Sequence, residues 1–303
     1  MNGFEQTLTT GIEGGTIILY PALGELIGER AGIVNLGTEG CMLGGALAAI
    51  VVGSITGSAW LGVLAGFGAG AIVGLAHALL VVKRNANQLA SGLVLWFLAL
   101  GLTSVLGANY VSAIVTPLPV IKVTGLGSIP WIGPIFFDHD PLVYVSYVLV
   151  AVVTWALYRT RLGLVIRATG ERPEVVAVAG RRPDWIQIGA VTFGAALAGV
   201  GGAQLSVGYV GNWSDDMTNG YGFIAVAVVL FAAWRPLLVL AGSYLFGVAL
   251  AAASVLEAHG VQVNQYFLDA LPYLVTLLAL VLLGRSGGRR APEGLTRALT
   301  NSS

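Results

Sequence analysis

Long apolar runs alternate with short polar segments along almost the whole chain. A helix that crosses the hydrocarbon core of a bilayer needs about 20 mostly apolar residues. Runs of this kind predict spanning helices at 8–28, 36–54, 59–82, 88–107, 141–158, 185–209, 220–234, 236–256 and 266–284. The run 220–234 is short for a crossing, and Trp234-Arg235-Pro236 leaves only a very tight turn after it. The pattern predicts an all-α, polytopic membrane bundle of about nine helices.

The composition indicates the same class of protein. Hydrophobic residues make up 56% of the chain and charged residues 10%, with a mean hydropathy of +0.83. Soluble domains carry roughly 25% charged residues, so this chain could not cover a water-facing surface. We expect one transmembrane domain over residues 1–303, surrounded by a lipid bilayer. The zero net charge gives no sign of nucleic-acid binding.

A charged segment, Arg159–Asp184, interrupts the apolar pattern with six arginines and three acids. Basic residues in short loops mark the cytoplasmic side of a membrane. If this segment is inside, alternating spans place fourteen of the fifteen Lys and Arg residues inside and only Lys122 outside. This orientation makes 108–140, with its prolines and Trp131, an outside loop packed on the membrane surface. It puts the N-terminus outside and the tail 285–303 in the cytoplasm, and that N-terminus lacks the basic start of a signal peptide.

Small residues recur at helical spacing within two of the predicted spans. On the third span they form a continuous seam: Gly62, Gly66, Gly70 and Gly74. The sixth span carries a similar seam: Ala195, Ala198, Gly199 and Gly202. Such seams let neighbouring helices approach closely, so we interpret these residues as helix-packing positions.

Polar residues inside the apolar regions are the candidates for a substrate pathway. The segment 28–40 has four glycines, which disfavour an unbroken helix. A carboxylate at membrane depth is costly, so Glu39 should face the protein interior or water. It either lines a substrate path or braces a broken helix, and both alternatives stay open. The candidate pathway residues are Asn35, Glu39, Gln88, Trp96 and Gln204, of which each taken singly also fits interhelical packing, as His77 does.

Catalytic signatures are missing from the sequence. It contains no HExxH zinc motif, no GxSxG elbow and no phosphate-binding P-loop. Three histidines and the single Cys41 leave few ligands for metal or thiol chemistry and exclude an intrachain disulfide. We therefore expect a protein that is not an enzyme and binds no metal or cofactor of its own.

Two motifs resemble the permease subunits of bacterial ABC importers, in the family that serves nucleosides, simple sugars and branched-chain amino acids. The string GERAGIVNLGTEGCM, residues 28–42, is similar to the "NxGxEGxM" signature of nucleoside-type members. The string GLVIRATGERPEVVAVAG, residues 163–180, is similar to the family's cytoplasmic coupling loop. Further similar stretches cover nearly the whole chain. Two departures from the family pattern, Trp234-Arg235-Pro236 and Asp184-Trp185, fall on the predicted cytoplasmic side.

The resemblance implies partners and a substrate class. The partners are a cytoplasmic ABC ATPase that binds ATP and Mg, an extracytoplasmic substrate-binding protein, and a second homologous permease, generally in a heterodimer. The expected location is a bacterial plasma (inner) membrane. Nucleosides rank first as substrate, simple sugars second and branched-chain amino acids third. An ion-coupled secondary transporter is the alternative from another class, with Glu39 and His77 as its ionisable candidates.

The resemblance also assigns a role to the charged segment, namely docking of the ATPase. We expect a short helix over about 171–180 that fits a groove on the ATPase. Pro173 suits a first helical turn, acids suit a helix N-terminus, and Gly180 suits a C-terminal stop. The expected ATPase-coupling residues are Gly163, Arg167, Gly170, Glu171, Pro173, Val175, Val176 and Gly180, with Val178 on the same apolar face.

Overall fold

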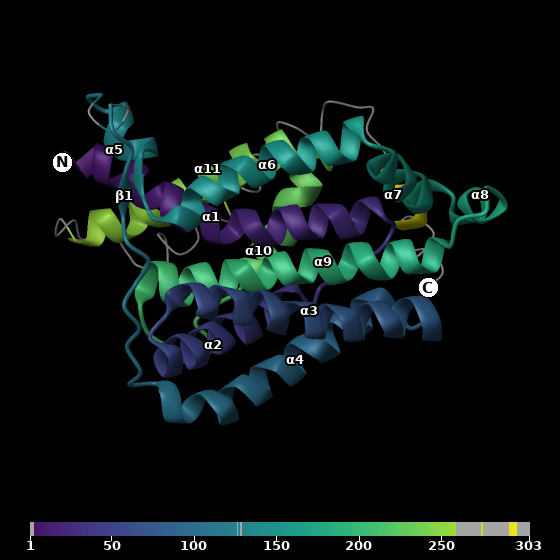
Figure 1. Ribbon diagram of the computed structural model, residues 1–303, viewed down its shortest axis with the longest axis horizontal. Helices are drawn as coiled ribbons and strands as arrows, with labels where there is room; N and C mark the ends of the chain where they lie inside the picture. The colour runs from purple at the N-terminus through teal and green to yellow at the C-terminus, as the bar shows by residue number, and fades with distance from the viewer. Residues whose placement is uncertain (1–2, 126, 128, 259–273, 275–290, 296–303) are drawn as a thin grey trace.

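The computed structural model describes residues 3–125, 127, 129–258, 274 and 291–295, and these form a bundle of long helices (Figure 1). The long helices are α1 (Gly3–Arg30), α2 (Thr38–Thr56), α3 (Ala59–Arg84), α4 (Gln88–Gly107), α6 (Pro141–Arg159), α9 (Pro183–Ala203) and α11 (Pro236–Ala258). The shorter helical pieces are η1 (Ala108–Tyr110), α5 (Ile132–Phe136), α7 (Arg161–Glu171), α8 (Pro173–Val178), the π-helical η3 (Gln204–Val210) and α10 (Tyr221–Phe231). Two short strands, β1 (Ile121–Lys122) and β2 (Asp138–His139), pair antiparallel.

The predicted class, a polytopic helical membrane bundle, is confirmed. Among the described residues, five helical segments are long and apolar enough to cross a membrane. They are Thr38–Thr56, Ala59–Arg84, Gln88–Tyr110, Pro141–Arg159 and Pro183–Val210. The predicted span 8–28 lies within α1, and the span 236–256 lies within α11. The predicted span 266–284 and all of the tail 285–303 except 291–295 lie outside the described residues.

Side-chain caps set where several of these helices begin. The Ser58 hydroxyl accepts a hydrogen bond from the Leu61 amide at the start of α3. Asn87 caps α4 in the same way, and Asp140 caps α6 directly before Pro141. These side chains pair amides that would otherwise be unsatisfied at membrane depth or at its edge, so the helix starts follow from the sequence.

The predicted crossing at 220–234 differs from the observed structure. Helix α10 has 11 residues and rises about 16 Å, which is half of a hydrocarbon core of about 30 Å. Before it, Gly211 accepts a hydrogen bond from the Val115 amide near one end of the bundle. After it, the Trp234 carbonyl accepts a hydrogen bond of 2.8 Å from Arg30 at the end of α1. The segment 211–234 therefore joins the two ends of the bundle, first as irregular chain and then as a short helix.

The helices α2, α3 and α9 pack with their backbones in contact along the predicted glycine seam. A Cβ atom on Gly62 would lie 2.6 Å from the Ala49 carbonyl oxygen of α2. A Cβ atom on Gly70 would overlap the Ala195 carbonyl oxygen of α9. Gly66 faces both neighbours, and Gly74 faces Ala195. Only glycine fits at such positions, so the seam brings these three helices together as one packed block.

Candidate functional site

The segment 31–37, which we term the motif loop, is irregular backbone held by side chains from the surrounding helices. The Val34 amide donates to Gln88 Oε1 at 3.0 Å, and the Val34 carbonyl lies 3.1 Å from His77 Nε2. The Gln187 amide group donates to the Ala31 carbonyl at 3.1 Å. Irregular backbone is tolerated at membrane depth only where protein partners satisfy it, and these side chains supply the partners.

Asn35 and Glu25 shape the end of the motif loop. The Asn35 amide donates to Glu25 Oε1 at 2.7 Å, and the Thr38 hydroxyl donates to Glu25 Oε2 at 3.0 Å. The Asn35 side-chain oxygen accepts from the Gly37 amide at 2.9 Å, which closes a tight turn. Glu25 precedes the end of α1 by five residues, or about 7.5 Å along the helix. Helix α2 therefore begins inside the bundle and not at its edge.

Glu39, in the first turn of α2, accepts three hydrogen bonds from the chain that leads into α10. Its Oε1 accepts from the Thr218 hydroxyl at 2.6 Å and from the Gly220 amide at 2.9 Å. Its Oε2 accepts from the Gly222 amide at 2.6 Å. The carboxylate is buried and caps the N-terminus of α10, where an anion is favoured by the helix dipole. Of the two alternatives for Glu39, this geometry is that of a brace.

Trp96 of α4 lies beside this brace. Its ring meets Phe223 of α10 edge to face, with centroids 4.9 Å apart, and Phe97 at 4.5 Å. The indole Nε1 is buried and has no hydrogen-bond partner among the residues that the structure describes. Trp96 is therefore an aromatic surface with an unused donor. Of the predicted pathway residues, Asn35, Glu39 and Gln88 are engaged with backbone, whereas the Trp96 indole N–H has no partner in the described part of the chain.

Gln204 lies at a different place, where α9 passes into the π-helical segment. Its Nε2 donates to Asp140 Oδ2 at 2.7 Å, and its buried Oε1 has no partner within the described part of the chain. Short π-helical segments occur frequently at functional sites. The structure does not bring Gln204 next to Trp96 by any hydrogen bond or ring contact among the described residues.

The charged segment forms the end of the molecule opposite α5 and β1, and α8 projects beyond the bundle (Figure 1). The charged segment contains two short helices where one was predicted. Helix α7 ends at Glu171, and α8 covers Pro173–Val178. Pro173 is in the first turn of α8, as expected, but Glu171 belongs to the end of α7. Gly180 has a left-handed φ of 76° and ends the turn after α8.

The valines of α8 divide between two environments. Val175 is 56% exposed and Val178 is 89% exposed, whereas Val176 is only 5% exposed. The Val176 carbonyl accepts a hydrogen bond from the Arg181 amide, so this residue holds α8 in place. The apolar face that is free for a partner therefore consists of Val175 and Val178 without Val176.

The other coupling residues pack against the bundle. A Cβ atom on Gly163 would overlap the backbone of α6, and one on Gly170 would overlap the Arg30 carbonyl of α1. The Arg167 guanidinium lies 5.2 Å from the centre of the Tyr158 ring. The Glu171 carboxylate accepts from the Glu293 amide at 3.2 Å. These contacts fix the angle at which α8 leaves the membrane domain.

Sequence reasoning did not identify Thr218, Gly222 or Phe223. Thr218 and Glu39 are 179 residues apart in the chain, and no spacing rule relates them. The one available signal was the placement of Gly220 and Gly222 before an apolar run, which favours a turn and a helix start.

Comparison with known proteins finds one matching family and several similar sequences. Residues 8–282 match the family described as branched-chain amino acid transport system / permease component. The guanosine ABC transporter permease protein NupQ of Bacillus subtilis is 32% identical over 290 residues, 90% of this chain and 91% of the relative. The nucleoside ABC transporter permease protein NupC of Lactococcus lactis subsp. cremoris is 32% identical over 89% of this chain and 90% of the relative.

A relative named for a sugar is also similar to this chain. The putative glucose ABC transporter permease protein TsgC13 of Haloferax volcanii is 41% identical over 244 residues, 79% of this chain and 74% of the relative. No solved structure matches the chain. Two of these three relatives are thus named for nucleosides and one for a sugar.

Proposed function

Because the chain belongs to the family of branched-chain amino acid transport system permease components, we propose that it forms half of the translocation pathway of an ATP-driven nucleoside importer. It is a membrane-embedded ABC permease subunit of the nucleoside and sugar group, a transport component and not an enzyme. Family membership implies an ATPase and a substrate-binding protein as partners in general. ATP and Mg would then bind to the ATPase, and this chain would carry no cofactor.

The observation that carries the choice of nucleosides is the Trp96–Phe223 pair. The two rings lie 4.9 Å apart at 88°, next to a buried indole N–H without a partner in the described chain. A nucleobase offers a flat π face for such rings and acceptor atoms for the indole N–H. A sugar has no π face, and only its C–H groups could pack on these rings. Two relatives named for guanosine or nucleosides match over about nine-tenths of the chain, which supports the same choice.

Uptake by the assembled transporter in proteoliposomes tests this choice. We expect labelled guanosine to accumulate, and unlabelled glucose in excess to leave that uptake unchanged. Trp96→Leu should raise the KM for guanosine about tenfold or more, since one stacked ring contributes about 1–3 kcal/mol. Leu98→Ala is the matched control, because Leu98 is an exposed residue of the same helix, α4. Uptake of glucose instead of guanosine would favour the sugar alternative, for which the 41% identity to TsgC13 is the specific support.

The second part of the proposal is that the ATPase docks on α8. The exposed Val175 and Val178, together with the projection of α8 beyond the bundle, support this role (Figure 1). ATP-driven closure of the ATPases would push α8 and rock the helix block to which α7 and α9 connect it. Docking here places the charged segment in the cytoplasm and the N-terminus outside, as the distribution of basic residues predicts.

Substitution of Glu171 and Arg167 in the reconstituted complex tests the docking role. We expect Glu171→Gln with Arg167→Gln to weaken co-purification of the ATPase and to slow uptake together. Wild-type assembly and uptake in this variant would contradict docking at this segment. Co-purification with a differently tagged homologous permease would support the proposed heterodimer, whereas self-association alone would oppose it.

Ion-coupled transport is the competing mechanism. Its two ionisable candidates, Glu39 and His77, are both engaged in hydrogen bonds within the protein. Uptake that persists after ion gradients are dissipated and stops when ATP is depleted would exclude this alternative. The opposite result would exclude the ATP-driven importer.

A further inference from the structure

An apolar groove with a volume of about 800 Å³ runs along the outer surface of the bundle between α6, α7 and α9. Its floor and walls include Leu149, Val152, Trp185, Ile186, Gly189 and Phe193. Val152 and Phe193 are exposed, so the groove opens away from the core of the described chain. Because α6 and α9 are both long enough to cross the membrane, the groove lies at membrane depth, where lipid or a partner helix would occupy it.

The depth of the groove matches one leaflet of a bilayer. It extends along α9 from Arg182 at the helix start to Phe193. Eleven residues of helix rise about 16 Å, and half of a hydrocarbon core is about 15 Å. The groove therefore accommodates an acyl chain from its headgroup end to the membrane midplane.

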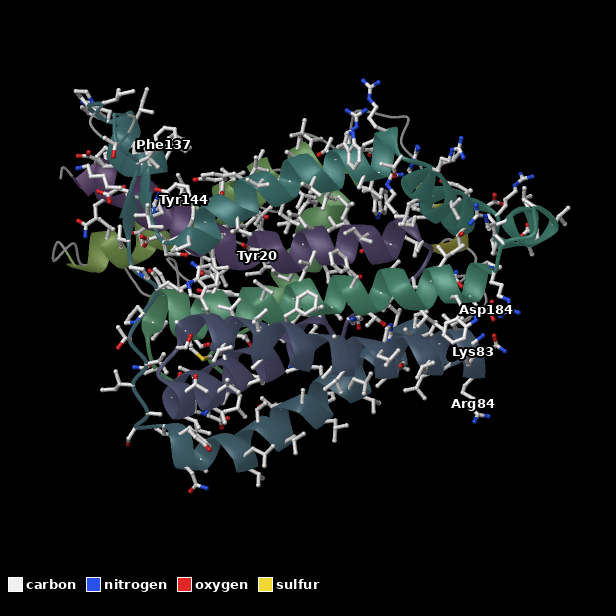
Figure 2. All side chains as sticks on the ribbon, in the orientation of Figure 1. Tyr20, Lys83, Arg84, Phe137, Tyr144 and Asp184 are labelled. Atoms are coloured by element: carbon white, nitrogen blue, oxygen red, sulfur yellow. The ribbon has the colours of Figure 1, made fainter. Side chains whose placement is uncertain are left out.

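The headgroup end of the groove is strongly basic. Arg161, Arg181 and Arg182 line it, and all three are exposed. Within the described chain none of these guanidiniums forms an ion pair. Asp184, the acid next to them in sequence, is paired with Lys83 at 2.7 Å, and Figure 2 shows both at this end of the bundle.

A tryptophan marks the level of the membrane interface at the same place. Trp185 is 57% exposed, and its ring centre lies 5.3 Å from the Lys83 ammonium group. Tryptophan and lysine gather where hydrocarbon gives way to headgroups. The three arginines of the groove therefore lie at headgroup level, immediately above the apolar channel.

We propose that this groove is a binding site for an anionic phospholipid. One acyl chain lies between α6 and α9, and the phosphate is bound by Arg161, Arg181 and Arg182. Guanidinium groups bind phosphate oxygens in bidentate fashion, and basic pockets between spanning helices on one membrane face suit anionic headgroups. A partner helix would fill the apolar channel equally well, but it would leave three cations at its mouth without counter-charge unless it carried matching acids.

Native mass spectrometry of the purified transporter complex, with full-length subunits, tests the proposal. Phosphatidylglycerol and phosphatidylcholine with identical acyl chains are added separately. We expect the wild-type complex to retain phosphatidylglycerol in preference to phosphatidylcholine. The R161Q/R181Q/R182Q variant should retain about one-tenth as much phosphatidylglycerol as the wild type, or less. Arg84→Gln is the control, since Arg84 lies at the same end of the bundle but does not line the groove (Figure 2). Equal retention by the triple variant and the wild type would overturn the proposal.

A second variant tests the role of the apolar channel separately from that of the three arginines. Gly189 lines the groove, and no atom lies within 4 Å of a Cβ built on it, so we expect the side chain of Gly189→Phe to enter the groove and fill it. We expect this variant to lose phosphatidylglycerol while it keeps the three arginines. A photo-crosslinker at Val152 should label lipid. Labelling of a partner subunit there would show that protein occupies the groove and would also overturn the proposal.

Discussion

The Thr218 hydroxyl donates a hydrogen bond of 2.6 Å to Glu39 Oε1 and so joins the start of α2 to the turn before α10. The same carboxylate accepts the Gly220 and Gly222 amides. One buried side chain thereby sets both the position and the capping of a helix that begins inside the membrane. The Glu39 brace thereby positions α10, which carries Phe223 of the proposed substrate contact.

Glu39→Ala should destabilise the chain by about 2–4 kcal/mol, because it removes the acceptor of two buried donors and one partly buried donor. Thr218→Val, which removes only one of these donors, should cost about 1 kcal/mol. Cys41 is the only cysteine and is buried, so its reaction with a thiol-specific dye on heating reports unfolding. A labelling midpoint for Glu39→Ala equal to that of the wild type would show that the brace contributes nothing.

Gly70→Ala should be destabilising by about 1–3 kcal/mol, since its methyl group would meet the Ala195 carbonyl in a well-packed interface. Gly68→Ala on the same helix is the matched control, because no atom lies within 4 Å of its Cβ position. Alanine is the better helix former, so Gly68→Ala should be neutral or slightly stabilising. Thermal unfolding followed by Cys41 labelling distinguishes the two variants, and identical effects would contradict the backbone contact.

The stability of the loop before α6 should depend on pH through His139. Its Nε2 donates to the Ile135 carbonyl at 2.8 Å, and its Nδ1 lies 3.5 Å from Glu13 Oε1. Burial disfavours the imidazolium, but Glu13 and the Ile135 carbonyl outweigh burial and raise the pKa of His139 above its ordinary value. The raised pKa adds stability that is complete below the unfolded pKa of about 6.5 and is lost as pH rises through the folded value.

We therefore expect the melting temperature of the wild type to fall from about pH 6 to about pH 8.5. Circular dichroism at the two pH values measures it. Glu13→Gln removes the charge that raises the pKa of His139, so its melting temperature should fall less over this range. Parallel curves for the two proteins would mean that the Glu13–His139 pair does not contribute.

Val178→Asp should reduce ATPase binding about tenfold or more while leaving the fold unchanged, because Val178 is 89% exposed and a charge in the centre of a docking face is costly. Ile55→Asp is the control, an exposed apolar residue at the end of α2. Co-purification of the ATPase measures both variants. A loss of ATPase in the Ile55 variant alone would place the docking surface elsewhere.

The sequence predicted most spans closely because the thickness of the hydrocarbon core imposes a length that apolar runs must meet. The run 88–107 coincides with α4, and 141–158 falls one residue short of α6. The half-length α10 was not predictable in this way. Its apolar run continues to Trp234, and the break comes from positive φ values at Ala233 and Trp234, residue types that do not signal such a turn.

The candidate site was predictable in its residue types but not in its partners. Burial of Glu39 follows from a carboxylate within an apolar run, whereas its choice of Thr218 depends on how distant helices pack. The coupling segment was predicted as one short helix because Pro173 marks a helix start. The preceding residues are also helical, since Thr160 caps α7 through the Gly163 amide at 3.1 Å.

The glycine seam has a mechanical consequence. Where Gly66 and Gly70 of α3 meet Gly199 of α9, backbone touches backbone, and there are no side chains to change rotamer and absorb a displacement. We therefore expect a displacement of α9 to move α3 with it and also α2, whose Gly45 meets Gly199. These three helices should therefore move as one rigid block, and bending should occur in the irregular segments that adjoin it, such as the motif loop.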